Sequence, residues 1–486
     1  MISIVEKIFR YAEANSDKPA LTDGKTALSY GELAERILSS GKILHERFNI
    51  SRGDNVILSA DKQLEFVSLY FACHILEAVT LPIAPDTNAK RYALIKSKVR
   101  PKLIVGFNDD SEDIMTAGLD EFSGINAESV NLNNINFPSE DSVADIIFTT
   151  GTTGEPKGVK LTHRNISSAA KNINTFIANS HEDIEMLALP VSHSFGLGRM
   201  RCALSNGQTL VMLGSFANVK RFFRFIETFH VNGFGMVPAS WALLKKLSGE
   251  TLGKYHEQIH YIEIGSAPMP IDEKKFLIEL LPDTRICMHY GLTEASRSAF
   301  MEFHEEISRL DTIGRQSPNM QIAIFDEQGQ KVPDNIEGEI CVKGDAVTSG
   351  YIGMDNKAFF WGDYFRTGDW GFRNSDGYIT LKSRKKELIN VGGKKVSPVE
   401  VEEVLRGFDF VKDCACIAIR DVNGILGEVV KAFIVSDNPE KVNFEYLDGL
   451  IGDKLEGFKH PAEYEVIDAI PKTSSGKVQR LLLVSN

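Results

Sequence analysis

ADIIFTTGTTGEPKG, residues 144–158, joins a short apolar run to a loop that is rich in hydroxyl groups and glycine. Residues 144–148 have the pattern of a buried strand, and residues 149–158 contain four threonines, three glycines and one lysine. Such a loop exposes backbone N–H groups where few side chains stand in the way, which suits a phosphate chain. Lys157 adds a positive charge. The stretch therefore indicates a phosphate-binding loop after a buried strand, with an ordinary turn as the alternative.

This loop is not a Walker A motif, which requires G-x-x-x-x-G-K-[ST]. Lys157 follows a proline rather than a glycine. Near the end of the chain, Ser475-Gly476-Lys477-Val478 lacks both the upstream glycine and the Ser or Thr after the lysine. The sequence therefore argues against an ordinary P-loop NTPase.

The composition is that of a globular protein with more than one domain. The chain has 486 residues, of which 43% are hydrophobic and 25% are charged, and its formal net charge is −12. This charge argues against a general nucleic-acid binder, and no apolar run approaches the length of a membrane span. The six cysteines are scattered and suggest neither a zinc site nor a disulfide framework. We therefore expect a cytoplasmic protein without nucleic-acid partners or integral membrane association.

Strand-like apolar runs alternate with helical patterns over most of the chain before residue 313. The strand-like runs are residues 55–59, 102–106, 186–189, 209–213, 261–264 and 285–288, and the helical patterns include residues 64–76, 219–230 and 272–281. This alternation predicts an α/β fold of helix-covered, mostly parallel sheets. Ligands are then expected at the loops beyond the C-terminal ends of the strands.

The pattern changes after about residue 313, where short strands stand between turn residues. A small β-rich, barrel-like subdomain is expected over residues 313–382. Beyond it, a helix start at 397–398, two strand patterns and a helix from about residue 444 predict a small α+β domain. We therefore expect an N-terminal domain of residues 1–385 and a C-terminal domain of residues 386–486.

Several motifs resemble, in the same order, those of the adenylate-forming (ANL) superfamily of acyl- and aryl-CoA synthetases, non-ribosomal adenylation domains and luciferases. They are residues 150–158, 190–196, 265–268, 290–294, 364–369, 383–389 and 471–477, with a weaker match at residues 28–33. Each motif alone is weak or moderate, but seven in order cover essentially the whole chain. The resemblance implies an acid–thiol ligase in which a carboxylate attacks the α-phosphorus of Mg-ATP, giving acyl-AMP and pyrophosphate. A thiol, from CoA or from the phosphopantetheine of a carrier protein, then attacks the acyl-AMP.

The resemblance assigns residues to the phosphates and the metal. Glu294 is implied to hold Mg²⁺, an ion that takes oxygen ligands and bridges phosphates, and Thr293 to contact the α-phosphate. By itself, Glu294 would more often be a surface or capping carboxylate. The residues implied to hold the β- and γ-phosphates are Thr149, Thr150, Gly151, Thr152, Thr153 and Gly154, with Lys157 as a mobile cation. Positive charge and oriented donors are needed here because a carboxylate must approach a polyanion.

The nucleoside contacts are also implied by resemblance. Asp369 can present two oxygens to the ribose hydroxyls, although an aspartate after Thr-Gly is also common in turns. Arg384 resembles a second ribose contact, and Lys477 resembles the adenylation lysine that bridges the attacking carboxylate and the nucleotide. The segments that resemble the adenine pocket are Gly265, Ser266, Ala267 and Pro268, together with Tyr290 and Gly291.

The thiol step is assigned in the same way. Lys386 resembles the hinge about which the small domain rotates after adenylation, and Gly392 and Gly393 resemble the face that admits pantetheine, since adjacent glycines allow close approach of a thin chain. The cluster of Lys and Arg residues at 382–395 is a candidate for the CoA phosphates or a solvated charged face. His193 resembles the histidine between acid pocket and thiol tunnel, with a buried packing role as the alternative.

The acid itself is less specified. Residues 190–197 contain no acidic side chain, and the amino-acid-activating branch uses an aspartate there, so an α-amino acid is disfavoured. The candidate acid pocket consists of Phe195, Met236, Val237, Pro238, Trp241 and Ser296. These side chains are mainly apolar and favour a fatty or aromatic acid. Arg199, Arg201 and Arg297 are left open between binding a second carboxylate, CoA or a carrier protein and forming ion pairs with nearby acids.

Three functions remain after this comparison. The leading one is an acyl- or aryl-CoA synthetase that uses ATP, Mg²⁺ and CoA. The second is a stand-alone enzyme that loads the acyl group onto the phosphopantetheine of a separate acyl or aryl carrier protein. The third is a non-catalytic relative that binds a nucleotide or acyl-AMP, which Lys157, Glu294, Asp369 and Lys477 argue against.

Overall fold

The computed structural model describes residues 2–61, 63–123, 135–149, 156–423, 425–437, 442–452, 454–472 and 478–484. The chain divides into two compact units, each described by itself below. Unit 1 comprises Met1–Ile322 and Val342–Phe365, and unit 2 comprises Ala323–Cys341 and Arg366–Asn486. The expected domain boundary and hinge at Lys386 stay predictions.

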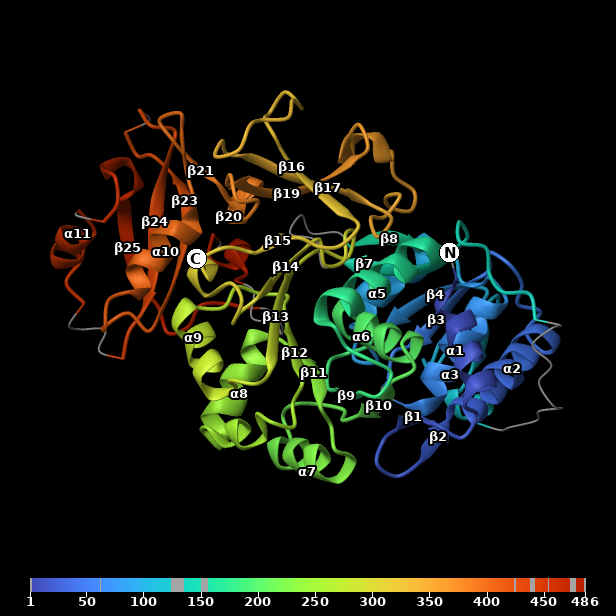
Figure 1. The fold of residues 1–486 in the computed structure, drawn as a ribbon. Coiled ribbons are helices and arrows are strands. Elements are labelled where there is room, and N and C mark those ends of the chain that lie inside the picture. The colour runs from blue at the N-terminus through green and yellow to red at the C-terminus, as the bar shows by residue number, and fades with distance from the viewer. Residues whose placement is uncertain are drawn as a thin grey trace. The chain divides into compact units, whose positions relative to one another are not determined.

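The larger sheet of unit 1 has nine strands in the order β15-β14-β13-β12-β11-β9-β10-β1-β2 (Figure 1). Six neighbouring strands, from β13 to β1, are parallel, and the strands at the two ends are antiparallel. The strands are β1 (Pro19–Thr22), β2 (Ala27–Ser29), β9 (Ile184–Leu187), β10 (Thr209–Met212), β11 (Gly233–Met236), β12 (Tyr261–Ile264), β13 (Arg285–Tyr290), β14 (Ala299–Glu302) and β15 (Arg315–Gln316). The expected mostly parallel sheet is confirmed.

A second sheet of unit 1 has six strands in the order β6-β5-β3-β4-β7-β8. They are β3 (Asn55–Ser59), β4 (Val79–Ile83), β5 (Leu103–Val105), β6 (Met115–Ala117), β7 (Val143–Thr149) and β8 (Lys157–Thr162). All neighbours are parallel except β8, which pairs antiparallel with β7 and places Lys157 opposite Thr149. The predicted phosphate-binding loop therefore connects the two strands of a hairpin. The next helix begins only at His163.

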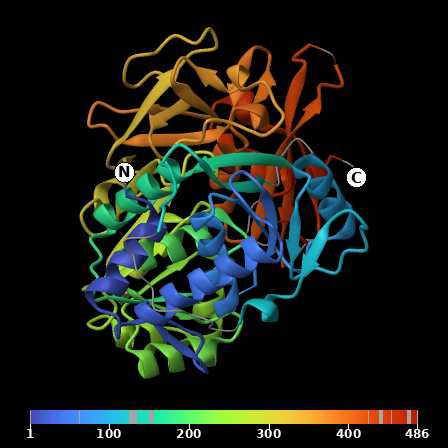
Figure 2. The same ribbon diagram turned by 90° about the vertical axis from the view of Figure 1, so that its right-hand side faces the viewer.

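Nine α-helices are described in unit 1. They are α1 (Ile4–Ala14), α2 (Tyr30–Glu46), α3 (Leu64–Ile75), α4 (Ala89–Val99), α5 (His163–Ile177), α6 (Ser194–Ser205), α7 (Val219–Phe229), α8 (Pro238–Ser248) and α9 (Ile271–Leu280). Helices α1, α2 and α3 pack against one another (Figures 1 and 2). Ser29 and Glu32 form a capping box that fixes the start of α2. Within the described ranges, none of the helices combines the length and the apolar character needed to cross a membrane.

The β-rich segment forms a five-stranded sheet in the order β16-β17-β19-β18, with β20 paired to β19. Its strands are β16 (Met320–Phe325), β17 (Gly338–Gly344), β18 (Phe360–Trp361), β19 (Tyr364–Arg373) and β20 (Ile379–Arg384). The sequence predicted a barrel-like subdomain, but the described strands follow an open path rather than a closed ring. The short 3-10 helices of the chain are η1 (Leu119–Phe122), η3 (Thr251–Tyr255), η4 (Ile307–Arg309), η5 (Asn356–Phe359), η6 (Lys385–Glu387), η8 (Gly457–Lys459) and η9 (Arg480–Leu482).

Unit 2 contains an α+β core, as the sequence predicted. Its remaining elements are β21 (Ile389–Val391), β22 (Lys394–Val396), α10 (Pro398–Arg406), β23 (Asp413–Arg420), β24 (Glu428–Val435), α11 (Phe444–Gly452) and β25 (Pro461–Val466). Because side chains alternate along a strand, Cys414 and Cys416 of β23 pack into one hydrophobic cluster and Ala415 and Ile417 into another. All six cysteines of the chain are buried free thiols.

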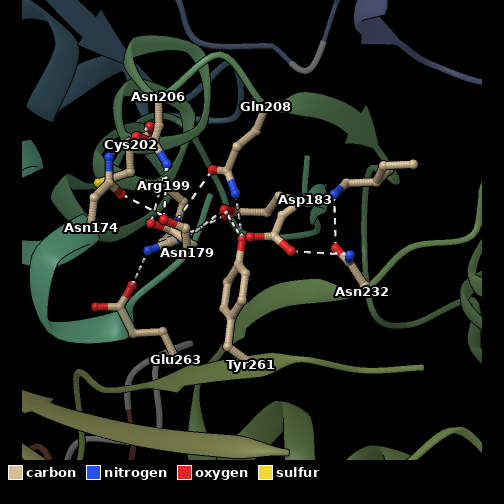
Figure 3. Close-up of polar contacts among 12 residues, drawn as sticks. Asn174, Asn179, Asp183, Arg199, Cys202, Asn206, Gln208, Asn232, Tyr261 and Glu263 are labelled. Carbon is tan, nitrogen blue, oxygen red and sulfur yellow. Dashed lines mark hydrogen bonds and ion pairs between the residues drawn. The ribbon is translucent and has the colours of Figure 1, made fainter. Parts of the chain in front are cut away.

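Helix α6 carries two arginines, Arg199 and Arg201, that form ion pairs with acids of two different sheets. Arg199 is fully buried and pairs with Glu185 of β9 and, at 3.0 Å, with Glu263 of β12 (Figure 3). Glu263 also lies 3.0 Å from Arg297, so two buried carboxylates face two guanidinium groups. Tyr261 completes the contacts by donating to Glu185 at 2.8 Å. Buried charges are tolerated only when paired in this way.

The second arginine of α6 reaches the six-stranded sheet. Arg201 lies 2.5 Å from the buried Asp145 of β7 and donates to the Tyr70 hydroxyl at 2.8 Å. Tyr70 and Thr80 also donate to Asp145, and His74 lies 3.3 Å away. Arg199, Arg201 and Arg297 therefore form ion pairs with buried acids, which answers the question that the sequence left open.

Removing Asp145 is expected to destabilise unit 1 strongly. Asp145→Ala leaves the Arg201 guanidinium without its buried counter-charge, which should cost about 3–5 kcal/mol of unfolding free energy. Denaturant unfolding measures this loss. The control is Arg10→Ala, which removes a pair whose arginine side chain is 60% exposed and should change stability by less than about 0.5 kcal/mol. Equal small effects of both variants would contradict the prediction.

His163 is expected to weaken the fold as the pH falls. Neither of its ring nitrogens meets a hydrogen-bond partner among the residues that the structure describes, and burial lowers the pKa of His163 from 6.5 to about 3. Between these values the unfolded chain binds a proton that the folded chain does not, so stability falls as the pH drops below 6.5. The loss between pH 7 and pH 5 should be about 2 kcal/mol.

The variant His163→Leu should lack this contribution. Between pH 7 and pH 5, the wild type should therefore lose about 2 kcal/mol more unfolding free energy than the variant. Denaturant unfolding at several pH values measures the difference. A difference that stays constant with pH would refute the assignment to His163.

Candidate functional site

Two loops of the candidate site in unit 1 follow neighbouring parallel strands. Residues 265–268 follow β12, and residues 291–294 follow β13, which begins at Arg285 and ends at Tyr290. Because β12 and β13 are parallel neighbours, their C-terminal ends meet at one edge of the sheet. The structure thus brings together the two segments that resemble the adenine pocket and the metal-binding motif.

The backbone of these loops is tightly packed. A Cβ atom on Gly265 would lie 2.1 Å from the His289 ring, and one on Gly291 would lie 2.4 Å from the backbone nitrogen of Arg297. Ser266 and Arg297 adopt left-handed φ angles of 73° and 51°, which non-glycine residues adopt at a cost of about 1–3 kcal/mol. Arg297 is held there by its ion pair with Glu263. This strain is of the kind that marks a functional site.

Glu294 is held by a hydrogen bond from Tyr351. It is 9% exposed, and the Tyr351 hydroxyl donates to its Oε1 at 2.7 Å. Its backbone carbonyl accepts from the Thr348 N–H at 2.7 Å, and its neighbour Thr293 donates to the Ser194 hydroxyl at 3.3 Å. The Tyr351 hydroxyl thus orients one carboxylate oxygen of Glu294.

Magnesium fits this carboxylate when it arrives with a phosphate chain. Among the described residues, no group of three or more His, Cys, Asp or Glu side chains could hold a metal ion. Mg²⁺ in nucleotide sites is held by one or two carboxylates together with phosphates and water. A single carboxylate such as Glu294 would suit a Mg²⁺ ion that is also held by a nucleotide.

The phosphate loop is described at its two ends. Thr149 is the last residue of β7, and Lys157 is the first residue of β8. The Thr149 hydroxyl lies 3.5 Å from the Lys157 carbonyl oxygen. The Lys157 ammonium lies 5.2 Å from the ring centre of Tyr351 and 4.8 Å from that of Phe359. The predicted phosphate ligands Thr150, Gly151, Thr152, Thr153 and Gly154 lie outside the described residues, as does Lys477.

The candidate ribose residues lie in unit 2 and are paired. Asp369 is 2% exposed, and its Oδ1 lies 2.9 Å from Arg384 Nε. Arg384 also donates to the Thr367 carbonyl at 3.1 Å, and Gly368 before Asp369 has a left-handed φ of 72°. The structure therefore brings Asp369 and Arg384 together; their contact with ribose stays a prediction.

Residues assigned to the thiol step also lie in unit 2. Lys386 is in η6, and Gly392 and Gly393 form the turn between β21 and β22 with left-handed φ angles of 57° and 85°. Such angles favour glycine. Several members of the predicted basic cluster are paired with acids, namely Arg384 with Asp369, Lys385 with Glu339 and Lys395 with Glu327. The cluster is thus partly neutralised within its own unit.

A small cavity of about 20 Å³ lies in unit 1 between α5 and α6. Its lining includes four apolar side chains of α5, together with Ser296, Thr293 and Arg201. Of the other predicted acid-pocket residues, Phe195, Met236 and Trp241 are buried, and Val237 and Pro238 are half-buried. The Trp241 indole donates to Glu273 of α9 at 2.7 Å, which ties this side chain to α9.

His193 directly precedes α6 and its side chain is exposed. Its role between acid pocket and thiol tunnel stays a prediction. Two residues of the site were missed by sequence reasoning: Tyr351 and Phe359. Neither belongs to a motif that was recognised, and their contacts with Glu294 and Lys157 join segments that are far apart in the chain.

Comparison with known proteins gives a consistent result. Residues 8–352 match the family described as AMP-binding enzyme, and residues 400–477 match the AMP-binding enzyme C-terminal domain. The chain is 30% identical to 4-coumarate–CoA ligase-like 9 of Arabidopsis thaliana over 93% of this chain and 84% of that protein. It is 27% identical to oxalate–CoA ligase of Arabidopsis thaliana over 97% of this chain and 96% of that protein.

A solved structure shares the fold. It is o-succinylbenzoate CoA synthetase (MenE) from Bacillus subtilis in complex with the acyl-adenylate intermediate OSB-AMP, with a TM-score of 0.86 and 24% identity. The match covers 98% of this chain and 97% of that chain. The expected fold class is confirmed.

Glu294→Gln is expected to remove the metal dependence of nucleotide binding. Mg²⁺ should strengthen ATP binding to the wild type. The affinity of the variant for ATP in the presence of Mg²⁺ should be lower by at least about tenfold, since even changes next to metal ligands lower metal affinity by this factor. Calorimetry with and without Mg²⁺ measures the effect. The control is Glu182→Gln, whose side chain is 80% exposed. If Glu294→Gln keeps the wild-type Mg²⁺ dependence, Glu294 is not the metal ligand.

Proposed function

Because this chain belongs to the family of AMP-binding enzymes, we propose that it joins a monocarboxylic fatty or aromatic acid to CoA through an acyl-AMP intermediate. Glu294 is the observation that carries the proposal. It is a carboxylate that Tyr351 holds at one oxygen, at the sheet edge where the adenine-like and metal-like motifs meet. A nucleotide-bound Mg²⁺ is the ligand that such a carboxylate suits.

Adenylation needs positive charge because the attacking carboxylate and the phosphates repel each other. Part of this charge would come from Mg²⁺ bound together with ATP. Glu294 would hold the ion, Thr293 would contact the α-phosphate, and Lys157 would move onto the β- and γ-phosphates. Interactions of this type stabilise the charge that develops in the transition state.

The remaining roles rest on the motif matches. Asp369 and Arg384 would contact the ribose, and Lys477 would bridge the acid and the nucleotide. For the thiol step, the C-terminal part would move about Lys386 and present Gly392 and Gly393 to pantetheine. The phosphopantetheine of a separate carrier protein is the alternative acceptor. It presents a thiol to the same residues as CoA does.

The ion pairs of unit 1 favour an acid with one carboxylate. Arg199, Arg201 and Arg297 are all paired with Glu185, Glu263 or Asp145. A second carboxylate would have to break one of these buried pairs, which costs several kcal/mol. The relatives include both a 4-coumarate–CoA ligase-like protein and an oxalate–CoA ligase, so likeness alone does not choose the acid. The paired arginines favour the aromatic or fatty class.

ATP–pyrophosphate exchange with a panel of acids tests the proposal. The panel should contain fatty, aromatic, dicarboxylic and amino acids, followed by CoA and a holo-carrier protein as acceptors. Exchange with fatty or aromatic acids and transfer to CoA is the expected result. Exchange only with dicarboxylic acids would overturn the acid class, and exchange with none would favour the non-catalytic alternative.

Lys477→Ala is expected to separate the two half-reactions. Adenylation should fall by about 100-fold or more, as when a donor to a developing charge is removed, while thioester formation from supplied acyl-AMP should stay within about threefold of wild type. The control is Lys472→Ala, which removes a nearby lysine that pairs with Asp413. Equal losses in both half-reactions of Lys477→Ala would show that Lys477 is not specific to adenylation.

A further inference from the structure

Residues 347–359, here called the bridging segment, contact two parts of unit 1. One is the loop that contains Glu294, and the other is β8, the strand that follows the candidate phosphate loop. At one end, Val347 pairs with Ala295, next to Glu294. Further along, the Gly350 carbonyl accepts from Lys160 at 3.0 Å and the Ile352 N–H donates to Gly158 at 2.9 Å. The segment thus acts as an extra strand beside β8 while it holds the backbone of the Glu294 loop.

Tyr351 lies at the centre of this segment and contacts both charged residues. Its side chain is 6% exposed. Its hydroxyl donates to Glu294 Oε1 at 2.7 Å, and its ring centre lies 5.2 Å from the Lys157 ammonium. The Phe359 ring lies at 4.7 Å and 69° to the Tyr351 ring and contacts the same ammonium at 4.8 Å. The two rings form an aromatic cradle for Lys157.

The two contacts of Tyr351 differ in strength and in purpose. A hydrogen bond to a ligating carboxylate fixes its orientation and is worth about 10–100-fold in metal affinity. A cation over an aromatic ring gains only about 0.5–2 kcal/mol, so phosphates can draw the lysine away. The anion and the cation touch different parts of Tyr351 and do not pair with each other among the described contacts. Both charges are therefore kept available for Mg-ATP.

We propose that Tyr351 is a positioning residue of the nucleotide site: its hydroxyl orients Glu294 for Mg²⁺, and its ring, with Phe359, holds Lys157 until the phosphates bind. This inference rests on the proposed function, because it takes Glu294 and Lys157 as the metal and phosphate residues. It adds a residue that no motif match assigned. It also explains why the bridging segment is anchored to both loops.

Two conservative variants separate the two contacts. Tyr351→Phe removes the hydroxyl and keeps the ring, whereas Phe359→Leu removes one ring and leaves the hydroxyl. Mn²⁺ serves as a paramagnetic substitute for Mg²⁺, and its binding in the presence of α,β-methylene-ATP is measured by electron paramagnetic resonance. Tyr351→Phe should weaken Mn²⁺ binding by about tenfold, and Phe359→Leu should leave it within about twofold of wild type.

The lysine is followed by NMR after reductive ¹³C-methylation, which keeps the positive charge. The Lys157 resonance, identified by its loss in Lys157→Arg, should be shifted upfield by the two rings and should move when the analogue binds. Phe359→Leu should reduce this shift before the analogue is added, and Tyr351→Phe should keep it. A general loss of structure would instead change both measurements in the same variant.

The outcomes separate this inference from the proposed function. If the wild type does not bind Mn²⁺ with the ATP analogue, the proposed function fails. If the wild type binds both but Tyr351→Phe leaves Mn²⁺ affinity unchanged, the role of the hydroxyl is overturned. If the Lys157 resonance of the wild type shows no upfield shift, the aromatic cradle is overturned even though the nucleotide site stands.

Discussion

The pairing of buried charges by helix α6 is the constraint on which unit 1 depends. Arg199 compensates carboxylates of the nine-stranded sheet, and Arg201 compensates the carboxylate of β7 in the six-stranded sheet. Two buried sheets with acids on their inner strands would be unstable without such partners. Because both arginines lie on one helix, α6 is held in a single position between two sheets. The hydroxyl of Ser194, at its first turn, is thereby placed beside Thr293.

The same electrostatic constraint extends to the candidate site. Glu263 of β12 binds Arg297, and Arg297 also donates to the carbonyls of Ser194 and Phe195. A buried ion pair thus holds Arg297, which follows the motif of residues 290–294, in its left-handed conformation. Residues that contact the nucleotide or acid need fixed geometry for catalysis. Arg199, Arg201 and Arg297, which the sequence left open between ligand binding and ion pairing, are therefore paired with buried acids.

Much of the fold could be predicted because strands and helices have local patterns. Residues 55–59 and 261–264 were predicted as strands with the bounds that the structure shows, since both are short apolar runs between polar segments. The barrel-like subdomain was less well predicted, because strand patterns do not reveal whether a sheet closes. Glu294, Asp369 and Arg384 were assigned to the site through motifs, and their roles stay predictions. Tyr351 was not, because its partner Glu294 lies 57 residues away in the chain and no spacing links them.

The sequence by itself determined the α/β architecture, the order of the adenylate-forming motifs and hence the chemistry that this chain is built for. These properties are written in local patterns of apolar, glycine and charged residues. The pairing of Arg199, Arg201 and Arg297 with acids, and the contact of Lys157 with aromatic rings, became visible only in the tertiary structure. The physical reason is that ion pairing and cation–ring contact depend on distances of a few ångströms in space, which the order of residues along the chain does not specify.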